Sequence, residues 1–501
     1  MKVFIRTFFS LLFLLIPSLL AAQSFSWVQL LQLADNVSAS LYVSDIALSE
    51  SGGIYLSARG GETEFGDVTL SAGSFLAKFT STGSIEWALS VPISMSDIAV
   101  DAKGKGLYGV GNWNGIVVTR YDLEGNHVWT TNVSRPDTIR ARATSIDIDA
   151  EGNIYVTGMV EREAFVAKLD GSGNILWTRR FTSTGGDFIP VWAPTALTLD
   201  NKGNVYVTVD VNDLAAADMT IIKLDPSGET VWMRNKIGSV PTAIAYDGND
   251  GLAVTMTFRG PGSIADSIWA TEGQYPNTAL ARYNTDGDLV SLVPFFSSGT
   301  YTGVGIHSLA FTSNELFLIG WFGGDTMRIQ GKEAVGNARI HSFIARFTND
   351  LTLTTLDTLI NEMTEPYDII VKTEGDNIFL TGAMYAETTN LWGTPLPVHN
   401  HAIFVGKIEN TLSVDERGAE ASSESITLSP NPVLNTARLS TDYSHIDRIA
   451  IYSIDGRLIY QIEPQENTGS TEIDLTNLPP GTYQIVLDGD KGRTVRNMMK
   501  L

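Results

Sequence analysis

A motif of about fifty residues recurs along most of this chain and constrains its fold more than any other feature. The clearest copy consists of two segments, Ser145-Ile-Asp-Ile-Asp-Ala-Glu-Gly-Asn-Ile-Tyr-Val-Thr-Gly158 and Phe165-Val-Ala-Lys-Leu-Asp-Gly-Ser-Gly-Asn-Ile-Leu-Trp177. In each segment, two runs of alternating apolar and polar residues flank a turn that contains glycine, which predicts a β-hairpin. Each copy therefore predicts four antiparallel strands.

Three positions identify the copies. The leading apolar residue of the first hairpin occurs at Ile46, Ile98, Ile146, Leu197, Ile244, Leu309 and Ile369. A basic residue of the third strand occurs at Lys78, Arg120, Lys168, Lys223, Arg282, Arg346 and Lys407. The fourth strand carries Trp87, Trp129, Trp177 and Trp232 and degenerates near Leu289 and Leu351. The spacing predicts seven copies.

The last copy lacks a fourth strand, whereas a segment of that type, Phe25 to Leu30, precedes the first copy. Closing the ring with this segment removes a free sheet edge, which all-β proteins otherwise have to protect. We therefore predict an all-β fold whose main domain, residues 23–412, is a seven-bladed β-propeller. The Asp-x-x-Gly turns and the tryptophans resemble a bacterial β-propeller repeat family whose units end in Gly-Asn-x-x-Trp, and this resemblance implies a fold and little about activity.

The first residues are typical of an export signal. Lys2 and Arg6 precede an apolar run from Phe8 to Leu20, and the small residues Ala21 and Ala22 follow. The apolar run is short for a membrane span, which needs roughly 20 residues. We therefore predict a cleaved signal peptide at residues 1–22 and no transmembrane segment in the mature protein.

Composition excludes several classes of function. The formal charge of −22 argues against nucleic acid as a partner, because a phosphate-binding surface needs clustered Lys and Arg. The chain has no cysteine, so it has no lipidated cysteine, no disulfide and no thiolate metal site. We expect no cofactor.

The C-terminal residues predict a second, smaller β-domain. A polar linker at residues 413–424 precedes residues 425–501, where three turn-rich signatures, Leu428 to Pro432, Ile451 to Arg457 and Ile473 to Tyr483, alternate with short strands. These features predict a small immunoglobulin-like β-sandwich.

The three signatures also resemble the type A C-terminal sorting domain of the type IX secretion system of Bacteroidota. The motif residues are Pro430, Asn431, Pro432, Gly456, Arg457, Pro480, Gly481 and Tyr483. The resemblance implies two partners, the secretion machinery and a sortase. It also implies transport across the outer membrane, followed by release or attachment at the cell surface.

Function is expected on the propeller face that carries the variable loops, because loops on a rigid scaffold are the usual place for recognition. Five tryptophans outside the repeat fall in segments assigned to these loops, and they are the candidate binding residues: Trp113, Trp192, Trp269, Trp321 and Trp392. Aromatic planes suit sugars and peptide side chains. The same rings also suit a role in capping the core.

Three functional hypotheses follow from this pattern. The first is a surface or extracellular binding or scaffold protein for an unidentified glycan, peptide or protein. The second is a secreted hydrolase or lyase with its site on the loop face, although no catalytic constellation stands out. The third is a purely structural surface protein.

No metal site is predicted. His399 and His401 form the only close histidine pair, and they would share one face of a strand. Asp147 and Asp149 lie in a sequence better explained by a hairpin turn than by a calcium loop, because it lacks the terminal Glu.

Overall fold

The computed structural model describes most of the chain between residues 25 and 500. The described part omits 34–39, 66–67, 135–139, 183–190, 213–216, 238, 259–262, 265–266, 269–277, 299–302, 337–339, 364–368, 376, 386–388, 392–393, 397–400, 409–425, 430–435, 442–444, 454–457, 463–469, 477, 479–480 and 490–491. The predicted signal peptide and linker therefore lie outside the described residues. Ala22–Glu409 and Asn410–Leu501 belong to separate compact units.

The described residues of the first unit form seven antiparallel sheets with four core strands each. Sheet I contains β2 (Tyr42–Leu48), β3 (Ile54–Gly60), β6 (Gly73–Phe79) and β7 (Ile85–Val91). Sheet II contains β8 (Ser94–Val100), β9 (Leu107–Asn112), β10 (Ile116–Tyr121) and β11 (His127–Asn132). Sheet III contains β12 (Ala141–Ile148), β13 (Ile154–Val160), β14 (Glu163–Leu169) and β15 (Ile175–Phe181). Sheet IV contains β16 (Val191–Leu199), β17 (Val205–Asn212), β18 (Ala217–Leu224) and β19 (Thr230–Ile237).

The remaining three sheets are more elaborate. Sheet V contains β20 (Ser239–Tyr246), β21 (Gly251–Phe258), β24 (Thr278–Asn284) and β25 (Leu289–Ser298), and a short hairpin of β22 (Ser263–Ile264) and β23 (Ser267–Ile268) interrupts its sequence. Sheet VI contains β26 (Gly303–Phe311), β27 (Glu315–Gly323), β30 (Ile340–Thr348) and β31 (Leu353–Met363). Sheet VII contains β32 (Ile370–Glu374), β33 (Asn377–Tyr385), β36 (His401–Ile408) and β1 (Phe25–Leu33).

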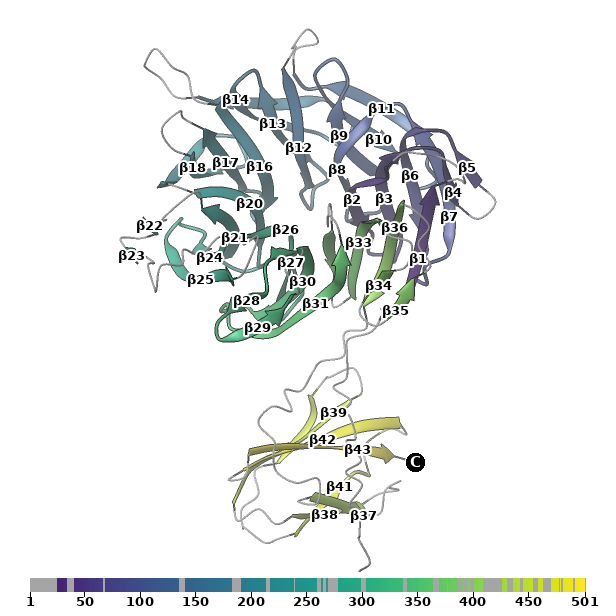
Figure 1. Ribbon diagram of the computed structural model, residues 1–501, viewed down its shortest axis with the longest axis vertical. Helices are drawn as coiled ribbons and strands as arrows, with labels where there is room; N and C mark the ends of the chain where they lie inside the picture. The colour runs from purple at the N-terminus through teal and green to yellow at the C-terminus, as the bar shows by residue number, and fades with distance from the viewer. Residues whose placement is uncertain are drawn as a thin grey trace, which may run out of the picture. The chain divides into compact units, whose positions relative to one another are not determined.

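The sheets are arranged around a central axis as in a β-propeller (Figure 1). The first strand of each sheet contacts the first strand of the next, and β32 contacts β2. β1 pairs antiparallel with β36, with Leu30 opposite Phe404. The N-terminal strand therefore completes sheet VII, as the orphan segment in the sequence predicts.

Three hairpins tie neighbouring sheets together. They are β4–β5 (Thr63–Phe65, Val68–Leu70), β28–β29 (Thr326–Ile329, Lys332–Val335) and β34–β35 (Thr389–Leu391, Thr394–Leu396), and they pair with the outer strands β1, β25 and β31 respectively. In each case the hairpin connects the second and third strands of one sheet and extends the outer strand of the preceding sheet. The hairpins thus cover outer edges that would otherwise be unpaired.

The repeat motif is explained by contacts between adjacent sheets. The Trp177 ring of sheet III lies against Gly228 in the last turn of sheet IV, and its Nε1 donates to the Pro226 carbonyl at 3.1 Å. Trp27, Trp87 and Trp232 donate to the equivalent turn of the following sheet in the same way. Where it is present, the recurrent tryptophan therefore holds one sheet to the next.

The repeated basic residue packs on the aromatic ring of the second strand. The Lys168 ammonium lies 4.7 Å from the centre of the Tyr155 ring, and Lys223 lies 5.1 Å from the centre of Tyr206. Such cation–π contacts contribute about 0.5–2 kcal/mol each.

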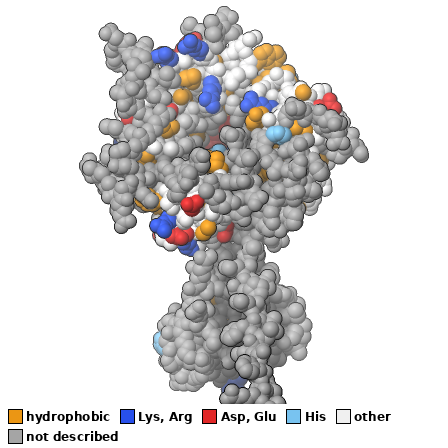
Figure 2. All heavy atoms as spheres, in the orientation of Figure 1, with side chains coloured by type: hydrophobic (Ala, Val, Ile, Leu, Met, Phe, Trp, Pro, Cys, Tyr) orange, Lys and Arg blue, Asp and Glu red, His pale blue; other side chains and the backbone are white. Residues whose placement is uncertain are grey.

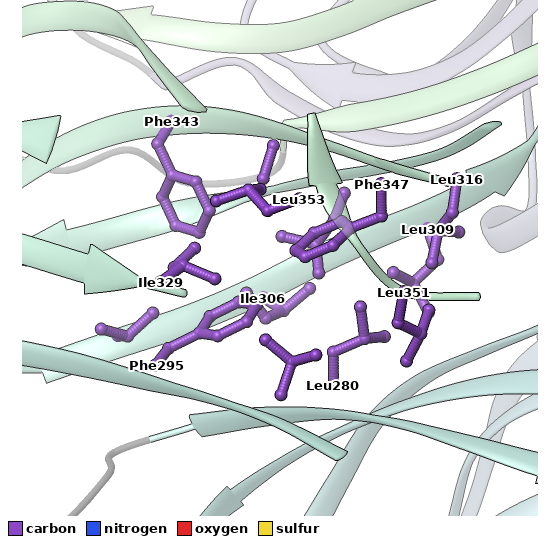
Figure 3. Close-up of a cluster of buried hydrophobic side chains, with 14 of the residues drawn as sticks. Leu280, Phe295, Ile306, Leu309, Leu316, Ile329, Phe343, Phe347, Leu351 and Leu353 are labelled. Carbon is purple, nitrogen blue, oxygen red and sulfur yellow. The ribbon is translucent and has the colours of Figure 1, made fainter. Parts of the chain in front are cut away.

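Where the repeat degenerates, the core between sheets becomes aromatic and aliphatic. Phe295 of β25 packs on Phe343 and Phe347 of β30, with ring centres 6.5 and 6.4 Å apart (Figure 3). Ile306 and Leu353 belong to the same buried cluster. This cluster replaces the tryptophan contact between sheets V and VI.

The C-terminal unit is also all-β. One sheet contains β37 (Ile426–Ser429), β38 (Thr436–Thr441) and β41 (Ser470–Asp474). The other contains β40 (Leu458–Ile462), β39 (Ile446–Ser453), β42 (Gly481–Gly489) and β43 (Gly492–Lys500). Leu439 and Ile473 of the first sheet share a buried core with Ile449, Ile451 and Ile485 of the second.

Candidate functional site

Antiparallel pairing gives the ring two unequal faces. One face carries the Asp-x-x-Gly turns, and we call it the turn face. In these turns Asp170 Oδ1 accepts hydrogen bonds from the backbone N–H groups of Ser172 and Asn174 at 2.9 Å. The opposite face, the loop face, carries the connections between second and third strands and between sheets.

Trp113 is the predicted binding residue that the structure exposes most clearly. It lies in the tight β9–β10 connection on the loop face, where its backbone N–H donates to Gly115 O at 3.0 Å. The adjacent Asn114 has a φ of 49°, which turns the chain sharply. The Trp113 side chain is 53 % exposed, an unusual exposure for so large an apolar ring.

Two of the predicted loop tryptophans lie in strands instead. Trp192 belongs to β16, opposite Val211, and Trp321 belongs to β27, opposite Ser342. Strand pairing extends further toward the loop face than the sequence predicts. The half-buried Trp321 ring packs over Gly305, where a Cβ would lie 2.3 Å from the indole Nε1. Trp321 is therefore a packing residue that needs glycine opposite it.

The structure does not describe the side chains of the other predicted binding residues. Trp269 and Trp392 lie outside the described residues, as does the side chain of Trp192. The structure thus does not bring the five tryptophans into one described cluster.

The sequence analysis did not identify a set of three carboxylates on the innermost strands, which we call the axial carboxylates. Asp45 of β2, Asp97 of β8 and Asp147 of β12 belong to the innermost strands, whose inner edge pairs with no other strand in the described part of the chain. Each carboxylate accepts a hydrogen bond from a backbone N–H of the next sheet, donated by Ile98, Ile146 and Leu199 at 3.3, 2.9 and 3.2 Å respectively. The repeated Asp-Ile pair at 45–46, 97–98 and 147–148 is the signal that would have identified all three.

Lys372 of β32 joins this set across the junction between sheets VII and I. Its ammonium lies 3.3 Å from the Asp45 carboxylate. Burial lowers the pKa of Lys372, but the carboxylates of Asp45, Asp97 and Asp147 outweigh this effect and raise the pKa above its usual range. Because the Lys372 side chain is 38 % exposed, solvent screens the ion pair between Lys372 and Asp45. We therefore expect this pair to contribute about 1 kcal/mol or less to the free energy of unfolding.

Burial shifts the carboxyl groups of Asp45 and Asp147 toward the neutral form. Burial, followed by the repulsion from Asp97, raises the pKa of Asp45 well above its usual value, and Lys372 opposes this rise. Burial raises the pKa of Asp147 to about 6, and backbone hydrogen bonds limit the rise. In Figure 2, acidic side chains are visible deep in the centre of the face in view.

The described residues offer no metal centre. Among them, no group of three or more His, Cys, Asp or Glu side chains is placed to hold an ion. His401 begins β36, and burial lowers the pKa of its imidazole, whereas His399 lies outside the described residues. Asp149 caps the β12–β13 turn, accepting from the backbone N–H groups of Glu151 and Asn153, as the hairpin interpretation predicts.

Of the two motif residues that the structure describes, Gly481 and Tyr483, the second lies in the core of the C-terminal unit. Gly481 begins β42, and Tyr483, 7 % exposed, packs with Leu439 and Ile485. Pro430, Asn431, Pro432, Gly456, Arg457 and Pro480 lie outside the described residues.

Comparison with known families decides the role of this unit. Residues 427–500 match the secretion system C-terminal sorting domain. The sorting domain marks proteins that are secreted across the outer membrane to the cell surface or the extracellular space, and it implies contact with the secretion machinery. The chain is therefore an exported protein.

Comparisons of the whole chain are less specific. No curated protein matches it. The structure is similar to U3-55K (11 % identity, TM-score 0.43, 76 % of this chain and 98 % of that one) and to the WD40 repeats of RRP9 (10 %, 0.42, 77 % and 99 %). A protein of unknown function from Bacteroides caccae is also similar (13 %, 0.30, 57 % and 89 %). We base the fold on the sheet topology rather than on these similarities.

Within the described residues, no helix is long and apolar enough to cross a membrane.

Proposed function

We propose that the chain is a secreted, seven-bladed β-propeller that binds an extracellular glycan, peptide or protein on its loop face. Sheets I to VII are the seven blades, and the pairing of β1 with β36 closes the ring. A cleaved signal peptide at residues 1–22 begins export, and an immunoglobulin-like sorting domain completes it through the type IX secretion system of a member of the Bacteroidota. A sortase then acts on the sorting domain.

The exposed Trp113 ring carries the binding proposal. Every described tryptophan of the repeat, Trp27 included, is at least partly buried between adjacent sheets, whereas Trp113 is 53 % exposed at the tip of a two-strand connection. Leaving a large ring in water forgoes roughly 1.5–3 kcal/mol of burial, which a bound ligand would recover. This favours recognition over a purely structural role.

Binding is favoured over catalysis by the state of the axial carboxylates. Asp45, Asp97 and Asp147 already accept hydrogen bonds from the backbone of the following sheet. Their oxygens satisfy the free inner edge of the propeller, which is a structural task. We propose that the chain is not an enzyme and needs no cofactor.

The test is a binding screen with the full-length chain on an array of glycans and extracellular proteins. We expect a specific ligand whose retention falls at least tenfold in Trp113→Ala. If no ligand is retained, or if Trp113→Ala retains the ligand as well as the parent chain does, the proposal is wrong.

A further inference from the structure

The loop face of sheets I to III combines exposed arginines with exposed aromatic rings. We propose that this surface binds an acidic polysaccharide, one that carries carboxylate or sulfate groups; this inference rests on the binding function proposed above and names its ligand class. We call the surface the cationic patch. It consists of Tyr42, Arg59, Trp113, Arg140, Arg142 and Arg162.

Two hydrogen bonds between neighbouring segments place most of the patch on one continuous surface. Asn112, next to Trp113, accepts through Oδ1 a hydrogen bond from the Ala143 backbone N–H at 3.0 Å, which brings the β9–β10 connection beside the start of β12. Glu161 N donates to Arg140 O at 2.7 Å, which joins the start of β12 to the β13–β14 connection. Trp113, the two arginines at 140 and 142, and Arg162 are therefore neighbours across sheets II and III.

Sheet I contributes a second aromatic and cationic pair. Arg59 lies over the Tyr42 ring, with its guanidinium carbon 5.2 Å from the ring centre, and Tyr42 is 36 % exposed. Both residues lie where β2 begins and β3 ends, which is the loop-face end of the sheet. The pair extends the patch toward sheet I.

Charge is distributed unevenly over this face. Arg140, Arg142 and Arg162 are exposed in sheet III, where Glu161 is exposed and Glu163 bonds to Arg180 at 3.2 Å. The same strand ends of sheet IV carry Asp210 and Asp218 and no Lys or Arg between residues 205 and 220. Figure 2 shows Lys and Arg side chains gathered in the upper part of the face in view. In a chain with a formal charge of −22, a cationic sector of this kind favours an anionic ligand.

The side-chain types fit an acidic sugar polymer. Guanidinium groups form paired hydrogen bonds with carboxylates and sulfates. Indole and phenol rings stack on the apolar faces of sugar rings, with a large contact area and little loss of side-chain entropy. A patch of four arginines is sparse, which suits the wide charge spacing of a polysaccharide better than the dense phosphates of duplex DNA.

The experiment measures the affinity of the full-length chain for polygalacturonate and chondroitin sulfate, with neutral dextran and duplex DNA as comparison polymers. We expect binding to the two acidic polysaccharides that weakens with salt, and at least tenfold weaker binding in Trp113→Ala and in Arg142→Gln. Lys103→Gln removes an exposed charge from the turn face and should leave the affinity unchanged. Circular dichroism confirms that each variant is folded, which is expected because the side chains are exposed.

Each other outcome overturns the inference: no binding to either acidic polymer, equal binding to dextran or DNA, or no effect of Trp113→Ala and Arg142→Gln. If the array retains a protein or a neutral glycan while the acidic polymers do not bind, the proposed binding function stands and only the ligand class is wrong. If nothing is retained in either experiment, both fail.

Discussion

The contact between Trp177 and Gly228 depends on the absence of a single side chain. Gly228 has a φ of +85°, and a Cβ at this position would lie 2.8 Å from the Trp177 ring. Gly248 has a similar φ of +81°, with nothing within 4 Å of its missing Cβ. The two glycines therefore separate backbone strain from the steric requirement of the tryptophan contact.

We predict that Gly248→Ala lowers the free energy of unfolding by about 1–2 kcal/mol, the cost of a left-handed alanine. Gly228→Ala should cost about 1–3 kcal/mol more, because the added methyl group displaces the indole ring. Denaturant unfolding of both variants measures the difference. Equal losses would show that the tryptophan contact is not tightly packed.

The raised pKa of Asp147 makes the folded propeller more stable at mildly acidic pH than at neutral pH. Its pKa is about 6 in the folded chain and 3.8 in the unfolded chain, so the folded state binds more protons between these values. Stability from this group is therefore greatest below pH 4 and declines as the pH rises toward 6. Asp45, whose pKa is also raised, acts in the same direction.

We predict that the free energy of unfolding falls between pH 4.5 and pH 6.5 and that Asp147→Asn makes this fall shallower. Because the Asp147 side chain keeps some contact with solvent, the change should be well below the full 3 kcal/mol or so expected for two pKa units. Urea titrations at several pH values provide the measurement. An unchanged slope in the variant would exclude Asp147 as the titrating group.

The repeat pattern predicted most of the strands and the closure of the ring, because hairpin periodicity is a local signal. The exceptions have a structural cause. In sheet V, Ser291 replaces the tryptophan opposite Arg282, and in sheet VI Leu351 replaces the glycine of the last turn and is buried. Both the tryptophan and the glycine of this contact are therefore absent between sheets V and VI. Because the two residues belong to different copies of the repeat, the pattern within one copy does not show that they are lost together.

The candidate site was harder to predict from sequence. The exposed position of Trp113 follows from a turn that the sequence analysis placed correctly in a loop, whereas Trp192 and Trp321 lie in strands that extend beyond the expected boundaries. The axial aspartates depend on contacts between sheets about fifty residues apart in sequence. Such contacts depend on the curvature of the ring, which hydrophobic periodicity does not encode.

At the level of strands, Arg346 of sheet VI is affected by the absence of a turn between the third and fourth strands of sheet VII. In sheets II and IV the basic residue of the third strand reaches the last turn of the following sheet: Arg120 donates to Gly171 O at 3.4 Å, and Lys223 donates to Thr285 O at 2.9 Å. Sheet VII has no such turn, because its third strand β36 ends at Ile408 and its fourth strand is the N-terminal β1, which begins at Phe25. Arg346 is 1 % exposed, its Nε and Nη2 have no acceptor among the described residues, and burial lowers the pKa of its guanidinium.

We predict that Arg346→Met raises the free energy of unfolding by about 1–3 kcal/mol, because it removes an incompletely paired buried charge. Lys168→Met is the matched control, since Lys168 is also buried at the equivalent strand position but lies 3.7 Å from the Asp149 carboxylate. The control should lose stability in the same denaturant assay. A loss in both variants would mean that Arg346 has an acceptor that stabilises it.

At the scale of the whole molecule, introduced cysteine pairs can test whether the N-terminal strand closes the ring. The chain has no cysteine of its own that could form a competing disulfide. Gln29 lies opposite Val405, and Leu30 lies opposite Phe404. Of two adjacent antiparallel pairs, one is the closer, non-hydrogen-bonded type that suits a disulfide.

We predict that at least one of the double variants Gln29→Cys/Val405→Cys and Leu30→Cys/Phe404→Cys forms an intramolecular disulfide and unfolds at higher denaturant concentration. Gln29→Cys/Phe404→Cys should not, because neighbouring side chains on a strand point to opposite faces. Mass spectrometry and non-reducing gels detect the bond. Intermolecular dimers alone would argue against a closed ring.

Hydrogen–deuterium exchange of the full-length chain with and without its retained ligand shows whether the ligand binds to the loop face. We predict slower exchange on binding at residues 112–116, 140–143 and 161–163, where the cationic patch lies. Slower exchange confined to the turn-face segments 122–126 and 170–174 would place the ligand on the opposite face and contradict the account.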